Sequence, residues 1–232
     1  MEKLCIVTGA NGSLGRAYLE GLQESREECI GVSRSTVANP LPGVRYIEGV
    51  DLLSLLDTEC MVRSLGPLDQ DIALVHPVGK FLFEWGTSGG GDINIDPDVY
   101  HSNVDTFQNI AESLLRMTAE SRAAVQVTLC GFGSVSDGYA VPYWRSYSVS
   151  KNALRSYIRS KIAEHGRAVR GLFVNVSTVD TGNENLLRPH ADKRYWLQPI
   201  EVVRASLAAL LGKEEGWREI SVICRKPDVD PH

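Results

Sequence analysis

The sequence lacks long hydrophobic runs, since no apolar stretch approaches the roughly 18 residues that a membrane-spanning helix needs. Its first residues also lack a basic segment followed by an apolar one, so we expect no secretory signal. The chain has only 5 cysteines, and they are scattered without a disulfide framework or the paired spacing of a zinc site. These absences predict a cytoplasmic protein with no membrane partner and no bound metal.

Neither sign of charge dominates, and internal repeats and low-complexity segments are missing. The chain carries 24 basic and 29 acidic residues, a formal net charge of −5, so the balance gives no sign of nucleic-acid binding. With 232 residues, 43% of them hydrophobic, it can bury a full core as one unit. We therefore predict a single domain over residues 1–232.

Segments typical of strands alternate with segments typical of helices. Such alternation predicts a Rossmann-like α/β fold, with a doubly wound, mainly parallel sheet and helices on both faces. Ligands of such a fold bind beyond the carboxyl ends of the strands. The predicted strands lie near 3–8, 29–32, 44–47, 71–75, 123–130, 169–175 and 219–223, and the predicted helices near 14–23, 54–65, 99–120, 147–164 and 200–211.

A glycine-rich turn joins the first predicted strand to the first predicted helix. When a strand, a glycine-rich turn and a helix follow one another, backbone N–H groups and the helix dipole point at a bound anion. Glycine has no side chain, so the anion can approach the backbone closely. Glycines also serve ordinary tight turns, but the position at the start of a β-α pattern favours a phosphate site. The residues predicted to hold a dinucleotide there are Gly9, Asn11, Gly12, Ser13, Leu14 and Gly15.

Tyr147 and Lys151 lie four residues apart in a segment of helical character. That spacing places both on one helix face, with the ammonium one turn from the phenol. A phenol normally has a pKa of about 10, and a nearby positive charge lowers that pKa by favouring the phenolate. The pair is a candidate proton donor to a carbonyl oxygen, while the alternative interpretation is an ordinary solvated helix face.

The run from Thr8-Gly9 to Gly15, together with Tyr147-x-x-x-Lys151, resembles the short-chain dehydrogenase/reductase superfamily along nearly the whole chain. In that family a serine lies shortly before the tyrosine, at the end of the preceding strand, and an asparagine lies in the helix before that strand. The resemblance implies that the catalytic residues are Asn103, Ser134, Tyr147 and Lys151.

Two of these assignments have alternatives. Ser134 lies thirteen residues before Tyr147 in a predicted loop, and Ser136 is the rival position. For Asn103, the alternative to a catalytic role is that it caps a helix or is a hydrogen-bonded polar group in the core. Tyr139 and Tyr143 lie at the wrong distance from the lysine, so we expect them to line or surround the site.

The end of the second predicted strand indicates the type of nicotinamide cofactor. An NAD site usually places an acid there, whereas this strand ends in Ser33 and Arg34. A guanidinium suits a 2′-phosphate, although a solvated surface arginine is the alternative. We therefore predict NADP(H). The resemblance implies further cofactor contacts at Asp51, Leu52, Pro77 and Thr181, although Asp51 also fits the start of the next helix.

Three stretches depart from the family pattern. Ser13 replaces the middle glycine, His76-Pro77 replaces the usual Asn-Asn pair after the fourth strand, and Ser177-Thr178 stands where Pro-Gly is usual. Proline has no N–H to donate, so any cofactor contact made by that N–H would be lost. These changes affect cofactor affinity more than proton chemistry.

The resemblance implies an NADP(H)-dependent oxidoreductase that interconverts a carbonyl and an alcohol. Tyr147 would donate the proton, Lys151 would lower its pKa and hold the ribose, Ser134 would bind the carbonyl oxygen and Asn103 would support a water relay. A small polar substrate is expected if the cations Arg188, Lys193 and Arg194 recognise a carboxylate or phosphate, although a solvated loop is the favoured alternative. Trp85 and Trp196 are candidate apolar walls, with packing in the core or at an interface as the alternative.

Two other functions remain open. One is a weakly active or inactive NADP(H)-binding sensor or partner protein, which the altered loops suggest. The other is a sugar-nucleotide epimerase or dehydratase, which shares the tyrosine-lysine chemistry but usually has a larger C-terminal region than this sequence shows. The resemblance also implies a homodimer or homotetramer. The strand near 217–223 suits a position close to a subunit contact, with completion of the monomer's own core as the alternative.

Overall fold

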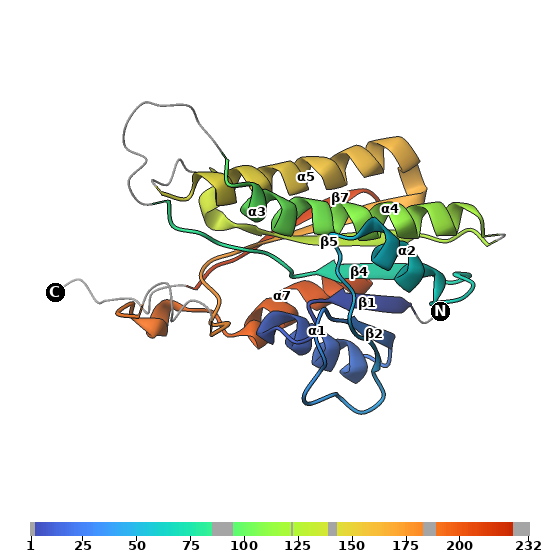
Figure 1. Cartoon of the computed structure of the whole chain (residues 1–232), viewed down its shortest axis with the longest axis horizontal. Coiled ribbons are helices and arrows are strands. Elements are labelled where there is room, and N and C mark those ends of the chain that lie inside the picture. The colour runs from blue at the N-terminus through green and yellow to red at the C-terminus, as the bar shows by residue number, and fades with distance from the viewer. Residues whose placement is uncertain (1–2, 85–94, 122, 139–142, 183–188, 225–232) are drawn as a thin grey trace.

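The computed structural model describes residues 3–84, 95–121, 123–138, 143–182 and 189–224. Its centre is a seven-stranded sheet in the order β3-β2-β1-β4-β5-β6-β7, and every neighbouring pair is parallel (Figure 1). This confirms the predicted Rossmann-like fold. The strands are β1 (Leu4–Thr8), β2 (Glu28–Val32), β3 (Arg45–Ile47), β4 (Ile72–His76), β5 (Val127–Ser134), β6 (Val169–Val176) and β7 (Trp217–Val222).

Helices cover both faces of the sheet. One face carries α1 (Ser13–Glu24) and α7 (Pro199–Leu211), and the other carries α2 (Leu55–Arg63), α4 (Thr106–Ala119) and α5 (Arg145–His165) (Figure 1). Two apolar cores result, one on each face. The inner strands β1 and β4 are buried along their whole length, as expected for a parallel sheet that is covered twice.

The fifth strand differs from the prediction, because it runs over Val127–Ser134 and not over residues 123–130. It pairs with β6 along its full length, from Val127 opposite Val169 to Ser134 opposite Val176. Glycines permit this extension: a Cβ on Gly133 would lie 2.3 Å from the Phe173 ring and 2.9 Å from Asp137 Oδ2. Ser134 is therefore the last residue of a strand and not part of the predicted loop.

The helix predicted over residues 99–120 is interrupted. A short helix, α3 (Pro97–Tyr100), passes into a π-helix, η1 (His101–Asp105), before α4 begins. The Thr106 hydroxyl donates to the Ser102 carbonyl at 2.8 Å, so the side chain bonds a carbonyl of the irregular turn. π-Helical turns inside α-helices are frequent at functional sites, and this one contains Asn103.

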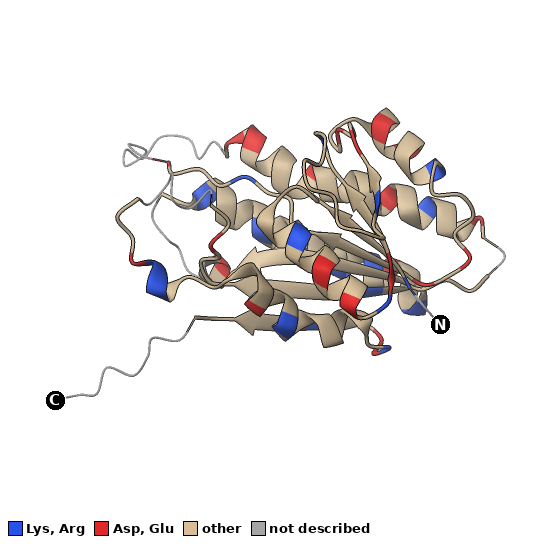
Figure 2. Cartoon of the chain, turned by 90° about the horizontal axis from the view of Figure 1, so that it is seen from below, with Lys and Arg blue, Asp and Glu red and all other residues tan. Residues whose placement is uncertain are grey.

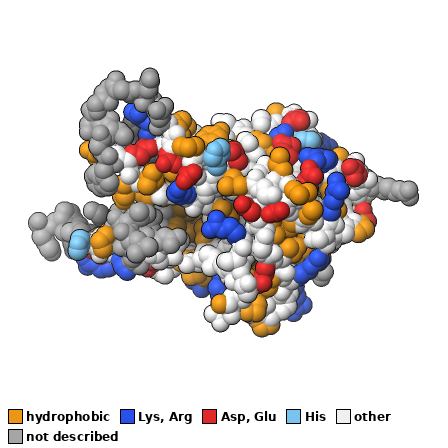
Figure 3. Space-filling model, in the orientation of Figure 1, with side chains coloured by type: hydrophobic (Ala, Val, Ile, Leu, Met, Phe, Trp, Pro, Cys, Tyr) orange, Lys and Arg blue, Asp and Glu red, His pale blue; other side chains and the backbone are white. Residues whose placement is uncertain are grey.

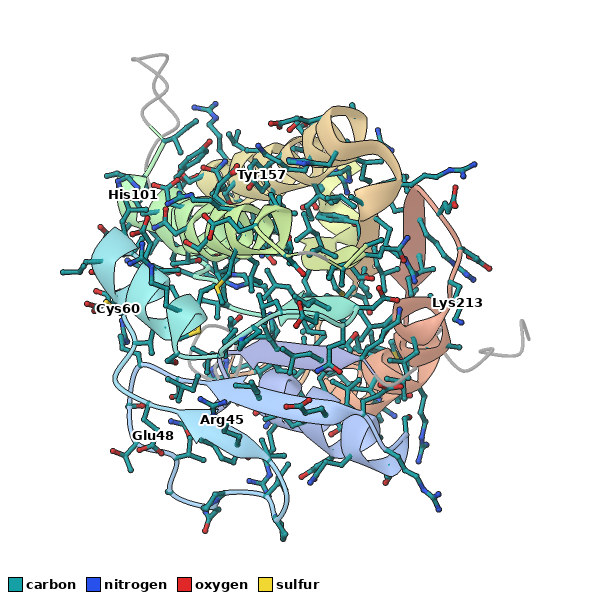
Figure 4. The ribbon with its side chains drawn as sticks, turned by 90° about the vertical axis from the view of Figure 1, so that its right-hand side faces the viewer. Arg45, Glu48, Cys60, His101, Tyr157 and Lys213 are labelled. Carbon is teal, nitrogen blue, oxygen red and sulfur yellow. The ribbon has the colours of Figure 1, made fainter. Side chains whose placement is uncertain are left out.

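The surface mixes charges of both signs. Figure 2 shows Lys and Arg interspersed with Asp and Glu over the helices, and the space-filling view of Figure 3 shows hydrophobic and charged side chains mixed on one face. Cys60 lies exposed on α2, away from Tyr157 on α5 (Figure 4). None of the described helices has the length and apolar character needed to span a bilayer.

Candidate functional site

A cavity of about 760 Å³ opens at the carboxyl ends of the central strands. The turns after β1, β4 and β6 and the last residues of β5 contribute to its lining, and the first part of α5 adds one wall. Parallel sheets of this topology bind ligands at this edge. The predicted site residues among its lining are Gly9, Asn11, Gly12, Ser13, Leu14, Gly15, Pro77, Ser134, Tyr147, Lys151 and Thr181.

The glycine turn is shaped for close approach of a ligand to the backbone. Gly9 has φ +62°, a conformation that glycine adopts without strain. A Cβ on Gly15 would lie 2.3 Å from the Gly9 carbonyl oxygen. The N-cap of α1 is Gly12, no side chain caps the helix, and its first turn has no acidic residue. This donor-rich helix start fits a pyrophosphate.

Two polar residues of the glycine turn, one of them the departure Ser13, have structural partners. The Ser13 hydroxyl donates to the Thr181 carbonyl at 3.1 Å, which ties the glycine turn to the segment after β6. Asn11 Nδ2 donates to the Ser33 hydroxyl at 2.9 Å and to two carbonyls of the following turn, at Ser35 and Thr36. The glycine turn is thus fixed on both sides.

Tyr147 and Lys151 lie together on the cavity side of α5. The Lys151 ammonium is 5.4 Å from the centroid of the Tyr147 ring, and both residues line the cavity. Lys151 is only 5% exposed, and burial lowers the pKa of its ammonium to about 8, partly offset by the carboxylate of Asp137. The pair therefore places a cation beside the phenol in a mostly desolvated setting.

Ser134 faces the same cavity and is positioned by Asp137. The Ser134 backbone N–H donates to Asp137 Oδ2 at 2.9 Å. Asp137 is buried, and desolvation raises its pKa against the opposing effects of this hydrogen bond, Lys151 and Arg155. Arg155 lies 3.5 Å from the same carboxylate oxygen. Sequence reasoning missed Asp137, because its charged partner Arg155 lies 18 residues further along the chain.

Asn103 lies behind the cavity and is not among the residues that line it. Its side chain is fully buried, and Oδ1 accepts from the Lys80 backbone N–H at 2.6 Å. Nδ2 donates to the Lys80 carbonyl at 3.0 Å and to the Ser150 hydroxyl at 2.8 Å. Ser150 in turn donates to the Tyr147 carbonyl at 2.7 Å. The asparagine therefore connects the chain after β4 to the helix turn that carries Tyr147.

His76 occupies a fully buried position at the end of β4. Its ring lies between two hydroxyls, with Nδ1 2.8 Å from Thr8 Oγ1 and Nε2 3.0 Å from Thr106 Oγ1. Burial lowers the pKa of His76 to about 3, so the ring is neutral. The Thr106 hydroxyl donates its proton to the Ser102 carbonyl, so its oxygen can only accept a hydrogen bond from His76. We therefore assign the ring proton of His76 to Nε2.

The residues predicted at the ends of β2 and β3 do not line the cavity. Ser33 is buried and its hydroxyl donates to the Ser35 carbonyl at 2.7 Å, while Arg34 is exposed. Leu52 belongs to an apolar core. Asp51 accepts the Leu53 N–H at 3.0 Å, and the N-cap of α2 is Ser54, which lies three residues beyond Asp51.

The described residues that we expected near the substrate do not line the cavity. Arg194 pairs with Asp192 at 2.6 Å, and the Lys193 ammonium lies 5.6 Å from the ring centroid of Trp196, which is buried. Tyr143, with φ +69°, is 42% exposed. Trp85, Tyr139, Arg188 and the side chain of Ser136 lie outside the described residues.

Sequence reasoning also made no prediction for two aromatic residues near the proton-donating pair. Phe81 and Trp144 line the cavity, and neither belongs to a regular hydrophobic pattern.

The Glu84 carboxylate lies at the start of α5. It accepts from the backbone N–H groups of Arg145 at 2.9 Å and Ser146 at 3.3 Å, and also from the Ser146 hydroxyl. A carboxylate at the first turn of α5 stabilises that helix end.

Comparison with known proteins identifies relatives of the whole fold. The model of the "NAD dependent epimerase/dehydratase family" matches residues 5–182. No curated protein matches the sequence.

Three of the solved structures similar to the chain are dehydrogenases crystallised with NADP or a derivative. An alcohol dehydrogenase from Thermococcus sibiricus, complexed with 5-hydroxy-NADP, has 19% identity and a TM-score of 0.75 over 98% of this chain and 100% of that one. A short-chain dehydrogenase from Burkholderia cenocepacia, in complex with NADP, has 21% identity and a TM-score of 0.75 over 95% and 88%. A chain from Shigella flexneri, described as a short-chain dehydrogenase complexed with NADP, has 16% identity and a TM-score of 0.76 over 94% and 96%.

Proposed function

Because the chain belongs to the NAD dependent epimerase/dehydratase family, within the short-chain dehydrogenase/reductase superfamily, we propose that it is an NADP(H)-dependent oxidoreductase that interconverts a carbonyl and an alcohol. One observation supports this above all: the glycine turn, Ser134, Tyr147 and Lys151 line one cavity. A dinucleotide site and a proton donor therefore open to the same space.

The glycine turn and the start of α1 would hold the pyrophosphate, and Thr181 lies beside them. NADPH, when bound, supplies a hydride. We propose NADP(H) over NAD(H) because β2 ends in Val32, followed by Ser33 and an exposed Arg34 and not by an acid. Three similar structures were also crystallised with NADP or a derivative of it.

The chain's own residues would manage the proton. In the direction of reduction, the carbonyl carbon gains a hydride and the carbonyl oxygen gains the Tyr147 proton, so the product is an alcohol and the tyrosine regains a proton from solvent. Lys151 stabilises the phenolate that forms for that interval. Ser134 would donate a hydrogen bond to the oxygen as negative charge grows there.

Asn103 acts as a positioning residue in this proposal, since it does not line the cavity. Both N–H bonds of its amide have protein partners, the Lys80 carbonyl and the Ser150 hydroxyl. Through Ser150 it holds the backbone of Tyr147. This replaces the water relay that we expected from the resemblance with a fixed protein contact.

Tyr147→Phe tests the proposal. We expect turnover of carbonyl substrates to fall by about 10²-fold or more, the usual contribution of general acid catalysis, while fluorescence titration shows NADPH binding unchanged. Tyr157→Phe is the matched control, because Tyr157 lies on the same helix and bonds Glu112 at 2.8 Å, away from the cavity. Equal turnover in Tyr147→Phe and the control would refute the assignment.

The family match also supports a second candidate, an epimerase or dehydratase of nucleotide sugars, since the matching model carries both activities in its description. Such an enzyme returns the hydride to its substrate, so the cofactor shows no net change. Incubation with UDP-glucose and NADP⁺ or NAD⁺, followed by chromatography of the sugar nucleotide, distinguishes the two. A changed sugar without net NADPH formation would favour the second candidate.

We also propose that the protein works as a homodimer or homotetramer in the cytoplasm. The edge strand β7 is only half-covered. All five cysteines are free thiols, three of them buried and Cys60 exposed, which suits a reducing compartment. Light scattering of the purified protein measures the subunit number directly.

A further inference from the structure

Two aromatic side chains face the substrate end of the cavity next to the proposed proton donor. The Phe81 ring lies edge-on to the Tyr147 ring, with centroids 5.0 Å apart. It makes a second edge contact with Trp144, again at 5.0 Å. Phe83 lies behind them, 4.9 Å from Phe81 and 6.1 Å from Trp144. We call Phe81, Phe83 and Trp144 the aromatic wall.

The aromatic wall is fixed at both ends by hydrogen bonds to the elements that hold the catalytic residues. At one end, the Lys80 backbone bonds Asn103 twice. At the other end, the Glu84 N–H donates to the Tyr143 carbonyl at 3.0 Å and the Glu84 carboxylate accepts from the first N–H groups of α5. A surface held in this way is preorganised, so a ligand does not have to order it on binding.

Charge is scarce on the cavity lining. Among the described lining residues, Lys80 and Lys151 are the only charged ones. Lys151 belongs to the proton-donating pair, and the Lys80 ammonium is bonded to Asp98 at 3.0 Å. The described loop cations that suggested a polar substrate, Lys193 and Arg194, contact Trp196 and Asp192 and do not line the cavity.

We propose, on the basis of the proposed function, that the substrate is an uncharged carbonyl compound with an aromatic ring beside the carbonyl. The ring would lie against Phe81 and Trp144, and the carbonyl oxygen would reach Tyr147 and Ser134. Aromatic side chains favour edge-to-face and offset contacts with a planar ring, and sites of this kind combine apolar walls with a few polar groups that fix orientation. It differs from the small polar substrate that the sequence suggested, which also involved Arg188, a residue outside the described ranges.

The test compares four ketones with the holoenzyme: acetophenone, cyclohexyl methyl ketone, acetone and pyruvate. We expect kcat/KM for acetophenone to be about tenfold or more above kcat/KM for acetone and for pyruvate. We expect it to be about 2- to 10-fold above kcat/KM for cyclohexyl methyl ketone, which is the usual advantage of aromatic pairing. Conjugation makes acetophenone the less electrophilic ketone, so intrinsic reactivity does not produce this order.

The variants Phe81→Leu and Trp144→Leu test whether the aromatic wall is the source of the preference for acetophenone. Each is expected to lower kcat/KM for acetophenone about tenfold more than kcat/KM for acetone, with NADPH affinity recorded for each variant. Leu82→Ala is the control, since Leu82 is 37% exposed and does not line the cavity. Equal losses for acetophenone and acetone would overturn the role of the aromatic wall.

The outcomes separate this inference from the proposed function. Reduction of acetone or pyruvate as fast as acetophenone would overturn the aromatic substrate class and leave the reductase intact. Failure to reduce any of the four ketones, with NADPH bound, would overturn both the aromatic substrate class and the proposed reductase.

Binding of the alcohol product gives a second test. For Tyr147→Phe with NADP⁺, calorimetry should show 1-phenylethanol binding, and Phe81→Leu added to that variant should weaken this binding about tenfold. Equal binding of 2-propanol and 1-phenylethanol would also overturn the inference.

Discussion

Asn103 and Lys80 hold each other through two hydrogen bonds, one from the Lys80 N–H to Asn103 Oδ1 at 2.6 Å and one from Asn103 Nδ2 to the Lys80 carbonyl at 3.0 Å. The buried amide thus completes the backbone of an irregular segment after β4. Its remaining hydrogen bond reaches Ser150 on α5 at 2.8 Å. One side chain in a π-helix therefore sets the spacing between the cavity wall and the helix that carries Tyr147.

Asn103→Ala should lower kcat by about 10²-fold, because a displacement of about 1 Å at a reacting group has an effect of that size. It should also lower the free energy of unfolding by about 1–3 kcal/mol, since buried polar groups of Lys80 and Ser150 lose their partner. Steady-state kinetics and urea denaturation measure the two effects.

The control for Asn103→Ala is Asn109→Ala, which removes a bond from Asn109 Nδ2 to the Leu52 carbonyl at 2.8 Å without touching α5. Its kcat should equal that of the parent protein. If the two alanine variants lose kcat equally, the specific role of Asn103 in positioning Tyr147 is wrong.

Activity and stability should respond to pH in opposite directions because of Lys151. Burial lowers the pKa of its ammonium to about 8, from an ordinary value of 10.5. Carbonyl reduction should therefore decline as pH rises through about 8, since the charge beside Tyr147 is lost. Between about 8 and 10.5 the unfolded chain binds the proton and the folded chain does not, so the Lys151 contribution to the free energy of unfolding increases with pH there.

Asp137→Asn provides the check on that pH profile. The Asp137 carboxylate raises the pKa of Lys151, so its neutral replacement should move the alkaline loss of activity to lower pH. The amide oxygen of asparagine can still accept the Ser134 N–H, which now donates to Asp137 Oδ2. A pH–rate profile of kcat/KM, with melting temperatures recorded alongside, measures the effect. An unshifted alkaline limb would show that Lys151 does not control it.

Gly15→Ala should weaken NADPH binding by tenfold or more. The added Cβ would lie 2.3 Å from the Gly9 carbonyl oxygen and 3.2 Å from that of Thr8, so the turn has to move away from the helix start. Overpacking of this kind costs about 1–3 kcal/mol, and quenching of protein fluorescence by NADPH measures the affinity. Gly138→Ala is the control, because a Cβ there meets no atom within 4 Å. Unchanged affinity in Gly15→Ala would contradict the placement of the pyrophosphate.

Sequence reasoning succeeded where the signal is local. The glycine turn joins a strand to a helix over a few residues, and Tyr147 and Lys151 share a face of one helix, so both follow from spacing alone. The alternating segments predicted the doubly wound sheet, because buried parallel strands and amphipathic helices have different periods.

Features that depend on distant contacts could not be predicted in the same way. Asp137 pairs with Arg155 on α5, 18 residues along the chain, and Glu84 meets α5 sixty-one residues along the chain at Arg145. The π-helix around Asn103 has the same apolar pattern as an ordinary helix, so the sequence shows one uninterrupted segment. Strand β5 extends to Ser134 because β6 pairs with it there, which no local propensity indicates.

The anchors of the aromatic wall use main-chain atoms of Lys80 and the carboxylate of Glu84, and none of them involves the rings of Phe81 and Trp144. Exchanging these rings for other side chains leaves those hydrogen bonds in place, while a change at Phe81 removes its edge contact with the Tyr147 ring. Substitutions at Phe81 and Trp144 are therefore expected to alter substrate selectivity while the backbone of Tyr147 keeps its hydrogen-bonded supports from Ser150 and Asn103.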